Sequence, residues 1–210
     1  MSEIFDFFFS QYKTYTTTDT TLEIIAVVFG FLSVWFSKLN KIWVFPTGII
    51  STSIFVYLLL KWELLGDIMI NGYYFIMSIY GWYVWTRKVD EKQVTPISSI
   101  SLKEKRTAFI IFITTLIVVF IVYKTFDKWT SWVAYADTFT TAIFFVGMWL
   151  MAKRKIENWL FWIAGDIISV PLYFYKGLTF TSLQYLGFTF IAIFGYIAWK
   201  KSLYKNQLIS

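Results

Sequence analysis

The residues best suited to chemistry in this sequence lie together between positions 158 and 166. Asn158, Trp162 and Asp166 are spaced four residues apart, so an α-helix places all three on one face, with Trp159 close to it. A carboxylate beside indole rings attracts a cation, because the face of an aromatic ring is electronegative. Amide groups suit the hydroxyl groups of a ligand. The pattern predicts a binding site for a small organic cation with a flat ring.

The absence of cysteine and histidine excludes many other kinds of site. Thiolate chemistry, zinc or haem sites held by histidine, and a Ser-His-Asp triad all require residues that this sequence lacks. The sequence also has no P-loop, so we expect that the chain does not hydrolyse ATP. We therefore predict neither an enzyme nor a protein that depends on a cofactor.

The composition requires a lipid bilayer around the chain. Hydrophobic residues make up 58% of the 210 residues, charged residues make up only 15%, and the mean hydropathy is +0.60. Soluble domains are about 45–50% apolar and about 25% charged. A soluble protein of this size could not cover so much apolar surface. The sequence therefore predicts an all-α integral membrane protein.

Seven apolar stretches are candidates for transmembrane helices, each of which needs about 20 mostly apolar residues. They cover residues 22–37, 42–60, 64–85, 107–126, 134–152, 157–175 and 180–199. The polar stretch 86–106 is the one plausible linker, and its charges are typical of a solvated basic loop. Residues 1–21 place phenylalanines beside acidic residues, which fits either a short interfacial helix or a frayed terminus.

Polar and aromatic residues inside these apolar stretches extend the predicted site. Polar groups at membrane depth are costly and usually face a cavity or a partner. We therefore expect one polar cavity that is also lined by Trp43, Asn71, Gln184, Asp137 and Thr141. Two alternatives stay open for some of them. Tryptophans near helix ends often belong to the interfacial belt, and Asp137 could instead cap a helix or bond a neighbouring one.

Lysine and arginine are distributed unevenly over the two sides of these spans. Seven spans put the termini on opposite sides, and 14 basic residues fall on the side of the C-terminus against 5 on the other. The positive-inside rule places the richer side in the cytoplasm. We expect a multi-pass protein of the inner (plasma) membrane, with the N-terminus outside. The net charge of +6 then reflects topology and lipid contact rather than binding of nucleic acid.

The sequence contains an internal repeat. An offset of 114 residues aligns Gly81 with Gly195 and Trp85 with Trp199, while the middle helix aligns at 118, which requires a four-residue insertion at 150–157. The fourth span turns the second unit over, so the two three-helix units run parallel, as in some transporters. The expected units are an interfacial segment 1–21, a first bundle 22–85, a cytoplasmic loop 86–106, a linker helix 107–126 and a second bundle 134–202.

Two other kinds of membrane protein, a retinal protein and an intramembrane aspartyl protease, have little support in the sequence. A retinal protein needs a buried lysine in its last span, which here has none before Lys200. An intramembrane aspartyl protease needs two apposed aspartates. Asp67 and Asp166 each follow a glycine, but Asp67 lies at a helix start and the longer G-x-G-D pattern is absent. We keep the protease as a remote alternative.

Several ordered motifs between about residues 20 and 202 resemble one family of transporters. The runs 157–162 and 166–169 closely resemble the sixth span of PnuC-type vitamin transporters, whose core is W-x-x-W-x-x-x-N/D. The run 78–85 resembles the end of their third span, and 150–155 the end of their fifth. The last motif position, often Asn in members that carry nicotinamide riboside, is Asp166 here.

The resemblance implies a 3+1+3 fold similar to that of the SWEET sugar transporters and a homotrimer with a path through each protomer. It implies facilitated diffusion of nicotinamide riboside, or in some branches thiamine, with a cytoplasmic kinase that traps the vitamin by phosphorylation. It assigns substrate binding to Asn158, Trp159, Trp162 and Asp166. Nicotinamide riboside is the first expectation and thiamine the alternative. Both are cations, so the charge of Asp166 does not decide between them.

Overall fold

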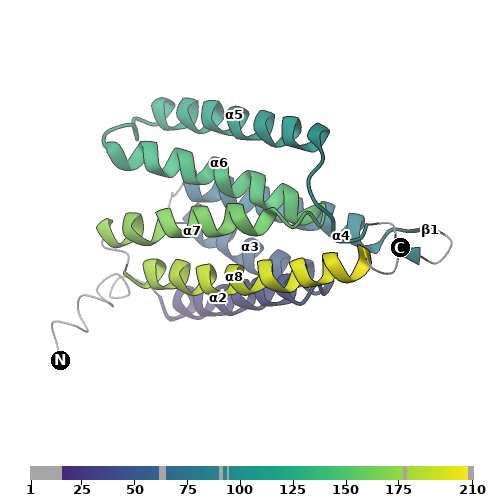
Figure 1. Ribbon diagram of the computed structural model, residues 1–210. Helices are drawn as coiled ribbons and strands as arrows, with labels where there is room; N and C mark the ends of the chain where they lie inside the picture. Colours follow the sequence, from purple (N-terminus) through teal and green to yellow (C-terminus); the bar gives the residue numbers. More distant parts are fainter. Residues whose placement is uncertain (1–15, 62–64, 90–91, 94, 177–178, 208–210) are drawn as a thin grey trace.

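The computed structural model of the protein describes residues 16–61, 65–89, 92–93, 95–176 and 179–207. Seven helices lie roughly side by side in this part of the chain (Figure 1). They are α2 (Thr17–Lys38), α3 (Val44–Lys61), α4 (Leu65–Thr86), α5 (Leu102–Thr125), α6 (Trp132–Ala152), α7 (Asn158–Tyr175) and α8 (Thr179–Gln207). Residues 1–15 of the predicted interfacial segment 1–21 lie outside the described residues, and residues 17–21 already belong to α2.

Each of the seven predicted apolar stretches forms a helix, and the prediction of an all-α membrane protein is confirmed. Among the described residues, five helices are long and apolar enough to cross a membrane: α2, α3, α5, α6 and the part of α8 from Thr181 to Lys205. The other two, α4 and α7, carry the polar residues Asn71 and Asp166 within their apolar sequences.

The connection between α4 and α5 is only partly the solvated loop that its charges predict. It contains a short hairpin of β1 (Lys88–Val89) and β2 (Lys92–Gln93). Residues 95–101, which we call the strap, then run along the turn between α6 and α7. The backbone N–H of Ser98 donates to the carbonyl of Arg154 at 3.1 Å, and that of Ile156 donates to the carbonyl of Ser98 at 3.0 Å. Ile97 is only 5% exposed and joins the core.

The buried side chain of Arg154 fastens the strap to the helices. Its Nη1 donates to the carbonyl of Thr95 at 2.8 Å, and its guanidinium lies 4.0 Å from the ring centre of Trp85. Burial lowers the pKa of the Arg154 guanidinium to about 10, so the group stays charged at neutral pH. A basic residue of the turn between α6 and α7 is therefore buried in the protein.

The two halves of the chain are related by a constant offset of 114 residues. Helices α3 and α7 begin and end 114 residues apart. The turns that precede them share a residue with positive φ, 53° at Asn40 and 54° at Arg154. The predicted offset of 118 for the middle helix, with its insertion at 150–157, is therefore wrong. A shift of four residues is about one helical turn, so it preserves the apolar pattern and the sequence alone could not exclude it.

The halves interlock through their first and third helices. Helix α4 packs against α6, and α8 packs against α2, which lies beside it in Figure 1. The indole Nε1 of Trp85 donates to the carbonyl of Ala152 at 3.1 Å, and that of Trp199 donates to the carbonyl of Ser37 at 2.9 Å. The two donors are separated by the repeat offset. Each half therefore binds the end of the first helix of the other half.

Four aromatic side chains fill the same end of the bundle: Phe45, Trp85, Trp159 and Trp199, which we call the aromatic plug. None of them is more than 2% exposed. The ring centres lie 5.0 Å apart for Phe45 and Trp85, 5.6 Å for Trp159 and Trp199, and 6.0 Å for the two residues Trp85 and Trp199. The repeat offset relates Phe45 to Trp159 as well, so both halves contribute equally to the plug.

We expect Gly81→Ala to destabilise the protein, because a Cβ atom at position 81 would overlap the ring of Phe45 and press on Ala152. Overpacking of a core typically costs about 1–3 kcal/mol. Gly72→Ala in the same helix is the matched control, since no atom lies within 4 Å of its added Cβ. Thermal unfolding in detergent compares the two variants. Equal melting temperatures would contradict the tight contact at Gly81.

Candidate functional site

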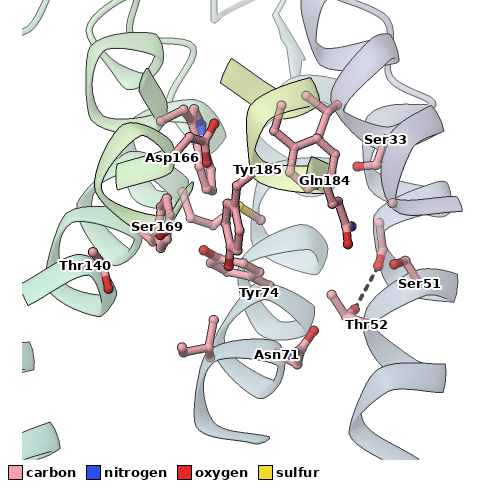
Figure 2. Close-up of a pocket in the computed structure, with 18 of the residues that line it drawn as sticks. Ser33, Ser51, Thr52, Asn71, Tyr74, Thr140, Asp166, Ser169, Gln184 and Tyr185 are labelled. Carbon is pink, nitrogen blue, oxygen red and sulfur yellow. Dashed lines mark hydrogen bonds between the residues drawn. The ribbon is translucent and has the colours of Figure 1, made fainter. Parts of the chain in front are cut away.

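A cavity of about 280 Å³ lies between the two halves. Its walls come from α2, α3 and α4 on one side and from α6, α7 and α8 on the other, and α5 adds Tyr123. The volume is near the lower end of the range of ligand pockets, about 300–1,000 Å³, so the cavity suits a small ligand. Figure 2 shows ten labelled lining residues: Ser33, Ser51, Thr52, Asn71, Tyr74, Thr140, Asp166, Ser169, Gln184 and Tyr185.

Asp166 of α7 is the most unusual residue of the lining. Its side chain borders the cavity although the residue is only 3% exposed. Within the described part of the chain, its carboxylate accepts no hydrogen bond and forms no ion pair. One turn further along α7, the hydroxyl of the fully buried Ser169 also lacks a hydrogen-bond partner there. A buried carboxylate is costly unless it is paired, so this wall is suited to a ligand that brings a positive charge.

Aromatic rings line the same cavity as this carboxylate. The ring centre of Trp162 lies 5.6 Å from that of Phe144 in a stacked pair and 5.9 Å from that of Tyr74, edge on. Phe144 can approach α7 because residue 165 is glycine, where a Cβ atom would overlap its ring. Flat faces beside a negative charge bind a flat cationic ring.

The opposite wall, formed by α2 and α3, carries neutral hydroxyl groups. Ser33 donates to the carbonyl of Val44 at 2.8 Å, and Ser51 donates to the carbonyl of Ala26 at 2.7 Å. Thr52 donates to the carbonyl of Gly48 at 2.8 Å, in the same region of the wall (Figure 2). Each hydroxyl hydrogen is thus used within the protein, and the oxygens remain as acceptors. This wall is suited to a ligand that carries hydroxyl donors.

The structure brings together seven of the nine residues that the sequence predicts for the site. The lining includes Trp159, Trp162, Asp166, Asn71, Gln184, Asp137 and Thr141. It does not include Asn158 or Trp43. Asn158 is fully buried at the start of α7, where its Nδ2 donates to the carbonyl of Lys155 at 2.6 Å. Trp43 precedes α3 and is 58% exposed.

An ion pair marks the end of the cavity that is remote from the plug. Nζ of Lys176 lies 2.6 Å and 2.8 Å from the two carboxylate oxygens of Asp137. Lys176 follows α7 directly, whereas Trp159 of the plug is in its first turn, about 25 Å away along the helix. The alternative that Asp137 bonds a neighbouring helix is therefore correct, although the residue also lines the cavity.

Comparison with known proteins gives a consistent result. Residues 20–201 match the family model for the nicotinamide mononucleotide transporter. The nicotinamide riboside transporter PnuC of Escherichia coli (strain K12) is 24% identical over an alignment of 204 positions, which covers 86% of this chain and 85% of that protein. The riboflavin/roseoflavin transporter RibM of Streptomyces davaonensis is 21% identical and covers 84% of this chain and 83% of its own length.

A solved structure shares the fold. The crystal structure of the Vitamin B3 transporter PnuC matches 90% of this chain and 84% of its own chain, with a TM-score of 0.68 and 23% sequence identity. At this identity the likeness concerns the fold.

Proposed function

Because this chain belongs to the nicotinamide mononucleotide transporter family of membrane transporters, we propose that it carries nicotinamide riboside across the membrane by facilitated diffusion. The observation that carries the proposal is that the buried carboxylate of Asp166, unpaired among the described residues, lines the same cavity as the rings of Trp162, Phe144 and Tyr74. Nicotinamide riboside is a flat cationic ring joined to a sugar. The relative from Escherichia coli, which is named as a nicotinamide riboside transporter, supports this choice of substrate.

The two walls suggest how the ligand lies. The positive ring occupies the wall of α6 and α7, with its charge near Asp166 and its face on Trp162. The ribose hydroxyls face the opposite wall and donate to the hydroxyl oxygens there, while the amide groups of Asn71 and Gln184 complete their hydrogen bonds. The site residues that we retain are therefore the seven that line the cavity.

The charges in the cavity favour the riboside over its phosphate ester. Lys176 is the one cationic side chain among the described lining residues, and Asp137 already neutralises it. A phosphate group would add negative charge near Asp166 with no cation to pair it, and an unpaired charge is costly in a site of low dielectric. Phosphorylation by a cytoplasmic kinase would therefore trap the imported vitamin, because the negative charge of the product disfavours its binding in the cavity.

The arrangement of the helices supports a mechanism of alternating access. We infer two parallel three-helix bundles, α2–α4 and α6–α8, joined by the linker α5 in the 3+1+3 manner of the SWEET transporters, and we propose that they rock about the cavity. The basic turns beside the plug support a cytoplasmic position for the plug and an N-terminus on the outside. A homotrimer in the inner membrane, with a path in each protomer, completes the proposal.

Calorimetric titration of the detergent-solubilised protein tests the substrate. We expect nicotinamide riboside to bind and nicotinamide mononucleotide to bind roughly 100-fold more weakly or not at all, because of its unpaired phosphate. Thiamine, also a cation, is titrated in parallel. Binding of thiamine alone would make thiamine the substrate, and equal binding of the riboside and the mononucleotide would contradict the charge argument.

A further inference from the structure

A second group of residues in the cavity has the same chemistry as the site at Asp166. At the outer end, the ammonium group of Lys176 contacts both carboxylate oxygens of Asp137, at 2.6 Å and 2.8 Å, and lies 4.7 Å from the ring centre of Tyr173. All three residues line the cavity. A cation held between a carboxylate and an aromatic face is the arrangement by which proteins bind organic cations. Here the cation belongs to the protein itself.

The first half of the chain shows what such an ion pair does away from the cavity. Lys61 at the end of α3 contacts the two carboxylate oxygens of Asp19 in α2 at 2.8 Å and 2.6 Å. Neither residue belongs to the described cavity lining, and the Lys61 side chain is 46% exposed against 22% for Lys176. Joining two helix ends therefore does not require a position in the cavity, and the position of the Asp137–Lys176 pair needs another explanation.

A series of ring contacts connects the outer group with the inner site. Tyr173 lies 5.0 Å from Tyr185 between ring centres, Tyr185 lies 5.9 Å from Phe144, and Phe144 lies 5.6 Å from Trp162. A flat cation that leaves Asp137 thus passes along a series of aromatic rings that line the same cavity as Asp166.

We propose that Asp137 and Tyr173 form a second, outer binding site for the cationic ring of the ligand, and that Lys176 occupies this site until the ligand displaces it. The inference rests on the proposed function in that the ligand is a cation. Displacement exchanges one cation for another, so the carboxylate of Asp137 stays neutralised throughout. The Lys176 side chain is partly exposed and can turn towards water. A neutral molecule cannot make this exchange, so the outer site selects for charge.

The test uses the N-methylated nicotinamide cation, which has the charged ring but no sugar, together with nicotinamide riboside. Removal of the internal competitor in Lys176→Met is expected to tighten binding of the methylated cation about three- to tenfold. Lys176→Arg retains a cation and should bind like the unchanged protein. Lys61→Met removes an ion pair of the same geometry outside the cavity and is the matched control. Asp137→Asn, added to Lys176→Met, should abolish the gain.

The outcomes separate this inference from the proposed function. Unchanged or weaker binding of the methylated cation in Lys176→Met would overturn the outer site, even if nicotinamide riboside binds the unchanged protein. A gain for the methylated cation, with no binding of nicotinamide riboside to any variant, would support the outer site and reject the proposed substrate. The melting temperature of Lys176→Met, compared with that of Lys61→Met, shows whether the variant folds. If it does not fold, Lys176→Gln replaces it, and the same outcomes apply.

Discussion

Asp166→Asn is expected to weaken the binding of nicotinamide riboside by roughly 10- to 100-fold, the usual loss when a buried charged partner becomes neutral. The change keeps the size of the side chain and removes its charge. The reduced form of the riboside, whose ring is uncharged, should bind both proteins almost equally. The difference between the two ligands therefore isolates the electrostatic contribution of the carboxylate.

Titration of both ligands into both proteins measures this contribution. Asp19→Asn is the matched control, because Asp19 is also a buried aspartate, 4% exposed, but does not belong to the described cavity lining. It should leave both affinities unchanged. Equal losses for the charged and the uncharged ligand in Asp166→Asn would show that Asp166 acts through shape or folding and not through its charge.

Trp162→Ala is expected to reduce the affinity by roughly 10- to 100-fold, since it removes the ring face that the cation contacts. Trp162→Phe keeps an aromatic face between Phe144 and Tyr74 and should retain most of the binding. Uptake into proteoliposomes that contain the purified protein should follow the same order.

Trp82→Ala provides the control for loss of an indole ring, because Trp82 is 41% exposed on α4 and does not belong to the described lining. It should bind the ligand normally. Normal binding by Trp162→Ala would mean that Trp162 only fills space beside Phe144, and the ligand ring would then have to be placed elsewhere.

The spacing of residues on one helix face predicts correctly that two residues of α7 line one cavity. Trp162 and Asp166 are four residues apart, and both line the cavity. The same spacing puts Asn158 on their face, but Asn158 is buried at the start of α7, where its Nδ2 donates to the carbonyl of Lys155, and it does not line the cavity. Helical periodicity predicts the direction of a side chain, whereas the hydrogen bonds at the start of a helix depend on the turn that precedes it.

The hydrogen-bond partners of the hydroxyl wall and the burial of the strap could not be predicted, for a different reason. Ser33 and Ser51 are single small residues in apolar helices, and their hydrogen bonds reach carbonyl groups on a neighbouring helix. The burial of Ile97 and Arg154 likewise depends on contacts between segments more than 50 residues apart. Local charge predicts solvation correctly only where no such partner exists.

The exchanged tryptophan hydrogen bonds also constrain how the chain is assembled during synthesis. Trp85 donates to a carbonyl 67 residues later in the sequence, and Trp199 donates to one 162 residues earlier. When α4 leaves the ribosome, the acceptor of Trp85 has not been made. The carbonyl of Ser37 cannot accept its hydrogen bond from Trp199 until the last helix has been synthesised. The first three helices therefore enter the bilayer as an incomplete unit, and their packing is finished only when translation has delivered α8.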